Sequence, residues 1–199
     1  MFSKNQTNNF TGCIFALLLS IPLMVNAAKT TYQTANVHDF PAMANDLGGA
    51  GTLIRTKQSA HARLALSGLD SASAYTIWWV VFNYPESCAA GVGHCGLADL
   101  GDASTGASVF YATGFVSGDD GAANVTAHLN SGSLPMGIDV LIPGGLKEGN
   151  GFGAEIHMVV RSHGVIIPGM VAEQIGTHMG ACNVNACEDQ QALGFGPMD

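Results

Sequence analysis

The stretch YTIWWVVFNY, residues 75–84, is apolar at almost every position and rich in β-branched and aromatic side chains. Successive side chains of a strand point to opposite faces of a sheet, so a strand with two apolar faces needs cover on both sides. Trp78 and Trp79 are neighbours and face opposite ways, which favours core packing over a shared platform for stacking sugars. The stretch predicts a central strand at the heart of the hydrophobic core.

Short segments on both sides of this strand also have strand patterns. They alternate between apolar and polar residues or carry β-branched side chains, and turns rich in glycine separate them. The expected strands are 52–56, 61–67, 108–116, 122–129 and the segment GAEIHMVVRSHG at 153–164. Only MVAEQIGT at 170–177 is typical of a short helix. The pattern predicts an all-β fold, an antiparallel β-sandwich or alternatively a β-barrel, with one short helix near the C-terminus.

The first 27 residues are predicted to be a signal peptide. Lys4 leads into CIFALLLSIPLMV at 13–25, an uncharged run shorter than the about 20 apolar residues of a transmembrane helix. The small residues of VNA at 25–27 suit cleavage after Ala27 or Ala28. Residues 28–50 show weak periodicity and are expected to form an irregular arm, while 51–199 have a length that fits one β-sandwich domain. The protein is therefore expected to be secreted or periplasmic.

Charge limits the classes of partner. Lys4 is one of seven basic residues, so six remain after the leader is removed, against fifteen acidic residues. This negative excess repels phosphate backbones and anionic lipid, so nucleic acid and membrane surfaces are not expected partners. A small ligand or a metal ion is expected instead, and no pattern indicates an oligomeric state.

The cysteines predict two disulfides. Cys13 lies in the leader, and an even set of four in an exported protein is typically paired. The local pairs Cys88–Cys95 and Cys182–Cys187 are favoured, because glycine and asparagine let the short loops between them close. The alternative is a tetrahedral zinc site made of all four, which an oxidising compartment disfavours.

The segment GAEIHMVVRSHG places ionisable side chains on one face of the expected strand. Glu155, His157, Arg161 and His163 point one way, together with Val159, and the apolar residues between them point to the core. Glu155 and His157 are about 7 Å apart at Cα and could act on one ion or one substrate proton. His157 and His163 lie about 20 Å apart along a regular strand, too far to hold one metal ion.

Further metal ligands would have to come from elsewhere in the chain, where His128, His94 and His61 are available. The predicted metal site consists of His157, Glu155, His128 and His94, with copper or zinc as the candidate ion. The alternative is a solvated strand face with one or two ion pairs, which is the ordinary state of an antiparallel sheet.

Three functions follow from this pattern. The leading hypothesis is an exported protein that binds a metal ion or small ligand at a polar patch around Glu155, His157 and the long loop at 85–107. An enzyme is the second, either metal-dependent or using His157 as general base with Glu155 orienting it. The third is a structural or interaction protein with no small-molecule site. A phosphate-binding loop and a Gly-x-Ser-x-Gly elbow are both missing from the sequence, and no catalytic residue is assigned.

The segments YTIWWVVFN and AEIHMVVRSHG together resemble motifs of a group of uncharacterised exported bacterial proteins. The resemblance extends from about residue 50 to the second cysteine pair. It implies export and a β-rich domain, and it implies no activity and no functional residue.

Overall fold

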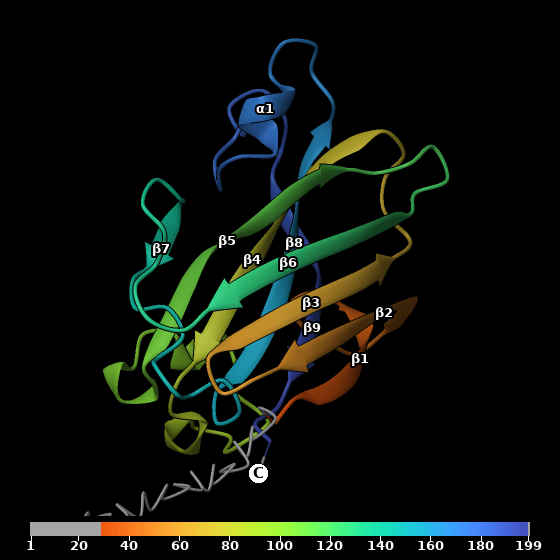
Figure 1. Cartoon of the computed structure of the whole chain (residues 1–199). Helices are drawn as coiled ribbons and strands as arrows, with labels where there is room; N and C mark the ends of the chain where they lie inside the picture. Colours follow the sequence, from red (N-terminus) through yellow and green to blue (C-terminus); the bar gives the residue numbers. More distant parts are fainter. Residues whose placement is uncertain (1–28, 199) are drawn as a thin grey trace, which may run out of the picture.

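The computed structural model describes residues 29–198, so the predicted signal peptide at 1–27 lies outside the described residues. Within that range the chain forms one antiparallel sheet of nine strands (Figure 1). The order across the sheet is β6-β3-β2-β1-β9-β8-β4-β5-β7. The strands are β1 (Thr31–Asp39), β2 (Asp46–Arg55), β3 (Ser59–Leu66), β4 (Ser73–Phe82), β5 (Ala107–Val116), β6 (Ala123–Asn130), β7 (Val140–Ile142), β8 (Glu155–Val165) and β9 (Glu188–Phe195). The short helices are η1 (Pro85–Ser87), η2 (Leu97–Asp99), η3 (Ala103–Thr105) and α1 (Val171–Gln174).

The sheet curls into a half-barrel. Strands β5 and β6 lie near opposite ends of the strand order, yet they contact each other and run side by side in Figure 1. The all-β antiparallel prediction with one short late helix is confirmed. The expected two packed sheets of a sandwich are replaced by one sheet, because strand twist accumulates over nine strands and bulges in β2, β5, β8 and β9 increase it.

Strand β4 is the centre of the fold, as its sequence predicts. It pairs with β5 on one side and with β8 on the other, and every one of its residues is buried. Trp79 belongs to a large core that draws on eight strands and fills the concave side of the curl, here called the inner core. Trp78 belongs to a smaller outer core on the convex side. The inner core includes Val37, Leu53, Leu64, Trp79, Phe110, Val125, Met158 and Leu193, and the outer core consists of Trp78, Val80, Phe82, Cys88, Cys95 and Val109.

Residues 28–50, expected to be an irregular arm, contain β1 and the start of β2, so that expectation is wrong. In β1 only Val37 is fully buried, and polar residues occupy much of both faces. The strand is held by its hairpin with β2 and by a short pairing with β9. Its polar composition hides the alternation that marks the other strands.

Arg55 ends β2 and lies fully buried beneath the ends of β8 and β9. Its guanidinium donates to the carbonyls of Ala154 (2.6 Å), Gly151 (3.4 Å), Phe195 (3.0 Å) and Gly196 (3.1 Å). Burial lowers the pKa of Arg55 to about 10, and the negative charge of nearby Glu155 opposes that change. Arg55 therefore joins segments that the sequence separates by almost a hundred residues or more.

Both local disulfides predicted from the sequence are formed, Cys88–Cys95 and Cys182–Cys187. The predicted late helix is α1, and Ile175 at its C-terminal end lies against β5, where its carbonyl accepts from the Tyr111 hydroxyl at 2.8 Å. There the Ile175 carbonyl approaches Gly114 so closely that a Cβ on the glycine would lie 1.9 Å from the oxygen.

Within residues 29–198, no helix has the length and apolar character needed to cross a bilayer.

Candidate functional site

The outer face of β8 carries the predicted polar side chains, but loops cover much of it. The alternation is confirmed on the inner face, where Ile156, Met158 and Val160 join the inner core. On the outer face Glu155 is only 1% exposed and His163 is 0% exposed. A solvated strand face is therefore wrong for these two residues. The loop between Cys88 and Cys95, here called the cysteine loop, covers Glu155, and the chain after α1 covers His163.

Glu155 is held by three N–H groups. Its Oε2 accepts from the backbone of Gly93 at 2.7 Å, and its Oε1 accepts from the backbone of Cys95 at 3.0 Å and from Nε2 of His157 at 2.7 Å. The Cys88–Cys95 disulfide closes the loop that supplies both backbone donors. The carboxylate and the disulfide together place this loop against β8.

His157 is oriented by its neighbours. Because the Glu155 carboxylate accepts, Nε2 of His157 carries the hydrogen, and Nδ1 is left without a hydrogen-bond partner among residues 29–198. The ring meets Phe82 edge-on, with ring centroids 5.6 Å apart. It also lies beside Gly194, its partner in the β8–β9 register. Packing and one hydrogen bond fix the ring while one nitrogen stays available.

A cavity of about 360 Å³ lies next to this pair. Three histidines, from β1, the cysteine loop and β8, line it together with Glu155. The lining also includes the polar side chain of Asn36 and the apolar side chain of Met43. The histidines are His38, His94 and His157.

Strand β9 provides the floor of this cavity. Its sequence ALGFG at 192–196 places Leu193 and Phe195 in the inner core and leaves the small residues Ala192, Gly194 and Gly196 on the outer face. Since β9 lies between β1 and β8, these small residues leave space between His38 and His157. The cavity exists because the outer face of 192–196 carries no side chain larger than a methyl group.

An apolar trough continues from the cavity along the outer face of the sheet. It begins with a space of about 100 Å³ that shares His157, Met43 and Cys95 with the polar cavity. A further space of about 130 Å³ extends it toward Trp78 and His178. The walls of the trough are Phe40, Val80, Phe82, Leu97, Leu100 and Val159. A polar cavity and an apolar trough thus meet at the His157 ring.

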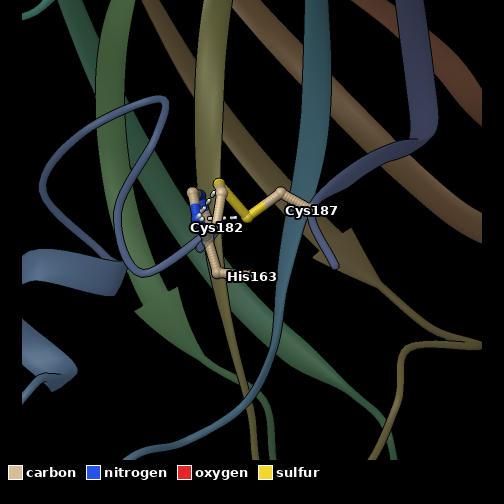
Figure 2. A group of neighbouring side chains, drawn as sticks. All are labelled: His163, Cys182 and Cys187. Atoms are coloured by element: carbon tan, nitrogen blue, oxygen red, sulfur yellow. Dashed lines mark hydrogen bonds between the residues drawn. A yellow bond between two sulfur atoms is a disulfide. The ribbon is translucent and has the colours of Figure 1, made fainter. Parts of the chain in front are cut away.

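A second group of side chains lies at the other end of β8. Figure 2 shows the His163 side chain directed at the disulfide between Cys182 and Cys187. Nδ1 of His163 lies 3.5 Å from Sγ of Cys187 and 3.9 Å from Sγ of Cys182, and it donates to the Gly180 carbonyl at 2.9 Å. The three side chains bring their ligand atoms within 4.8 Å of one another. They are here called the His163 cluster.

The orientation of the His163 ring is set from both sides. Since the Gly180 carbonyl accepts from Nδ1, Nε2 accepts from the hydroxyl of Thr76 at 2.8 Å, and Thr76 in turn accepts from Nε1 of Trp78 at 2.9 Å. Burial lowers the pKa of His163, and the bond to Gly180 works in the opposite direction. With the disulfide intact, the sulfurs are bonded to each other and are not thiolate ligands.

The four residues predicted as one metal site do not form a shared ligand set. Glu155, His157 and His94 line one cavity, whereas His128 lies on β6 at the far edge of the sheet. There it faces His61 on β3, with ring centroids 6.0 Å apart, and its Nε2 lies 2.9 Å from Asn130 Oδ1. The placement of His128 in the site is wrong because β6 is five strands from β8 in the sheet order.

The sequence pattern did not predict every residue of the cavity. His38 was missed because only the pairing of β1 with β9 brings it to the cavity. The alternation of small and large residues in ALGFG was a signal for the cavity floor. The separation of His157 from His163 was predicted, but the contact of His163 with the second disulfide was not, since it depends on how the chain after α1 folds back.

Comparison with family models, curated proteins and solved structures finds no match for this chain.

Proposed function

We propose that the protein is an exported binding protein for a small organic molecule. The polar end of the molecule occupies the cavity lined by His38, His94 and His157, and its apolar part lies in the trough. The observation that carries this proposal is the Glu155–His157 pair, which presents a fixed imidazole with one unused nitrogen where the cavity and the trough meet.

The contacts of Glu155 favour an organic ligand over a metal ion at this place. Three N–H groups already bind the carboxylate, two at Oε1 and one at Oε2, and a cation would compete with these donors. The ligand atoms of His38, His94 and His157 are not among those that converge within 4.8 Å in the described chain. Copper or zinc is therefore not the proposed occupant of this cavity.

The shape and chemistry of the site agree with small-molecule recognition. Ligand sites combine apolar walls with a few fixed polar groups that set orientation. Here the walls are Phe82, Val159 and Leu97, and Nδ1 of His157 can accept a hydrogen bond from a hydroxyl or amine of the ligand. A phenol or an alcohol with an apolar body has both features.

Export is part of the proposal. Two disulfides are typical of proteins in an oxidising compartment. The uncharged run at 13–25, expected to be the core of a signal peptide, supports the same location.

A second candidate function is general-base catalysis in the same cavity. The 2.7 Å contact between Glu155 and His157 has the geometry of a base oriented by a carboxylate. The cavity lining contains no serine or threonine, and its one cysteine, Cys95, is in a disulfide. His157 would therefore act directly on a substrate or on water, without a protein nucleophile.

An NMR screen of phenols, alcohols, amines and carboxylic acids with apolar bodies tests the proposal. Binders are expected to shift the amide resonances of Gly93 and Gly194 in the wild-type protein. His157→Ala should lower the affinity of these compounds about tenfold, which corresponds to the loss of one hydrogen bond. His128→Ala, at the far edge of the sheet, should leave the affinity unchanged. A screen in which no compound shifts these resonances, or in which His157→Ala binds equally well, contradicts the proposal. Release of a changed product would favour the enzyme instead.

A further inference from the structure

The distances in the His163 cluster are close to those of a tetrahedral metal centre. With metal–sulfur bonds of about 2.3 Å and metal–nitrogen bonds of about 2.0 Å, nitrogen and sulfur ligands lie about 3.5 Å apart and two sulfurs about 3.8 Å apart. Nδ1 of His163 lies 3.5 Å and 3.9 Å from the two sulfurs. Only the two sulfurs do not fit, because they are bonded to each other in the disulfide and would have to separate to bind one ion.

We propose that the His163 cluster is a metal site controlled by the redox state of the Cys182–Cys187 disulfide. When the disulfide is cleaved, the two thiolates and Nδ1 of His163 bind one thiophilic ion, Zn²⁺ or Cu⁺. When it is formed, the site loses two of its three ligands. The proposal concerns a different end of β8 from the organic-ligand cavity and does not depend on it.

The chemistry of the switch needs a reductant, which is a dithiol. Its two thiols transfer two electrons and two protons to the disulfide, so that one S–S bond breaks in the protein and one forms in the reductant. The metal ion then displaces the thiol protons of Cys182 and Cys187, because thiolate is the ligand form. Both cysteines are partly exposed, which gives the reductant and the ion access.

Hydrogen bonds of Asn185, in addition to the disulfide, hold the loop between Cys182 and Cys187 in place. Asn185, within that loop, donates through Nδ2 to the carbonyls of His163 and Val165, each at 2.9 Å. The backbone of Asn185 also donates to the Ala181 carbonyl at 3.0 Å. After reduction these bonds keep Cys182 and Cys187 next to His163, so the site is largely preformed.

The contacts of His163 also allow the change of tautomer that metal binding requires. Nδ1 now donates to Gly180, and it must give up that hydrogen to bind an ion. The hydrogen can be carried on Nε2, which faces Thr76 Oγ1, and a hydroxyl oxygen can accept from both Nε2 and Trp78. Such outer contacts orient histidine ligands in metal sites.

A fourth ligand is available from the backbone or from water. The Gly180 carbonyl oxygen lies 3.9 Å and 4.0 Å from the two sulfurs and 2.9 Å from Nδ1. The chain therefore supplies a neutral oxygen beside the three side-chain ligands, as four-coordinate zinc requires.

The first disulfide is a matched control. Cys88 and Cys95 are buried in the outer core and are not part of a convergent ligand set in the described chain. Reduction of that pair provides two thiols but no third ligand. The proposal thus distinguishes two disulfides of similar loop length.

Cobalt titration of the whole protein, before and after reduction with a phosphine, tests the proposal. The reduced protein is expected to bind one Co²⁺ with thiolate-to-cobalt charge-transfer absorption, to exchange it for Zn²⁺, and to bind none when oxidised. Cys182→Ser with Cys187→Ser should abolish the absorption, whereas Cys88→Ser with Cys95→Ser should keep it. His163→Gln should lower the affinity for Co²⁺ by more than about 100-fold. Loss of a residue that only hydrogen-bonds to a metal ligand has a smaller effect.

Alkylation of the wild-type protein gives a result that does not depend on how the variants fold. Zn²⁺ is expected to protect Cys182 and Cys187 of the reduced protein from iodoacetamide and to leave Cys88 and Cys95 unprotected. Absence of cobalt absorption after reduction, equal binding in the oxidised form, or equal protection of both pairs overturns the proposal.

Discussion

Glu155 and His157 are joined by a 2.7 Å hydrogen bond, and the same carboxylate holds the cysteine loop through two backbone N–H groups. One buried side chain therefore orients the imidazole and closes one wall of the cavity. The loop and the histidine are expected to respond together when this carboxylate is changed.

Glu155→Gln should lower the free energy of unfolding by about 1–3 kcal/mol, because an amide cannot accept from all three donors and leaves at least one N–H group of this partly buried network unpaired. Hydrogen exchange at the amides of Gly93 and Cys95 should become faster. Urea denaturation and exchange NMR measure both effects. His94→Ala is the control, since His94 is exposed and its loss should change stability by less than about 0.5 kcal/mol. Unchanged exchange at both amides would show that the carboxylate does not hold the loop.

Trp79→Ala should destabilise the protein by about 3–5 kcal/mol, since it removes a large side chain from the inner core. Thermal and urea denaturation provide the measurement. Met136→Ala is the matched control, because Met136 is fully exposed. A Trp79→Ala protein that melts at the wild-type temperature is incompatible with the inner core described above.

Arg55→Lys should destabilise the protein by about 2–4 kcal/mol, although the charge is kept. The compact ammonium of lysine cannot donate to four carbonyls as the guanidinium fork does, and hydrogen bonds to charged groups contribute about 1.5–3 kcal/mol each. Arg63→Lys on the exposed face of β3 is the control and should be nearly neutral. Equal stability of the two variants in urea would mean that the carbonyl contacts of Arg55 contribute little.

The buried hydroxyl of Tyr75 is expected to make the free energy of unfolding fall at high pH. Burial raises the pKa of its hydroxyl above the ordinary value of 10.0. An acid whose pKa is higher in the folded state binds its proton more tightly there, so its contribution is fully present below pH 10 and is lost as the pH rises through the folded pKa.

Urea denaturation between pH 8 and pH 11, a window of about one unit or more on either side of a tyrosine pKa, tests this expectation. Tyr75→Phe should remove part of the alkaline decrease, while Tyr32→Phe, at an exposed position, should not. If the free energy of unfolding of the Tyr75→Phe protein changes with pH as in the wild type, ionisation of Tyr75 does not cause the alkaline loss of stability.

Local patterns were sufficient for several elements. The two apolar faces of YTIWWVVFNY predicted a strand buried on both sides, and the alternation in β8 predicted that Ile156 and Met158 face the core. The short loops predicted both disulfides. These features depend on residues close in sequence, and strand periodicity or loop length is enough to define them.

The tertiary structure decided which of the polar residues meet. Pairing of β1 with β9 brings His38 to the cavity, and the position of β6 at the sheet edge removes His128 from it. The fold of the chain after α1 buries His163 against the second disulfide. The physical reason is that strand order and curl are set by long-range packing of the inner core, in which strands distant in sequence become neighbours, and no periodicity within one strand records which neighbour it will have.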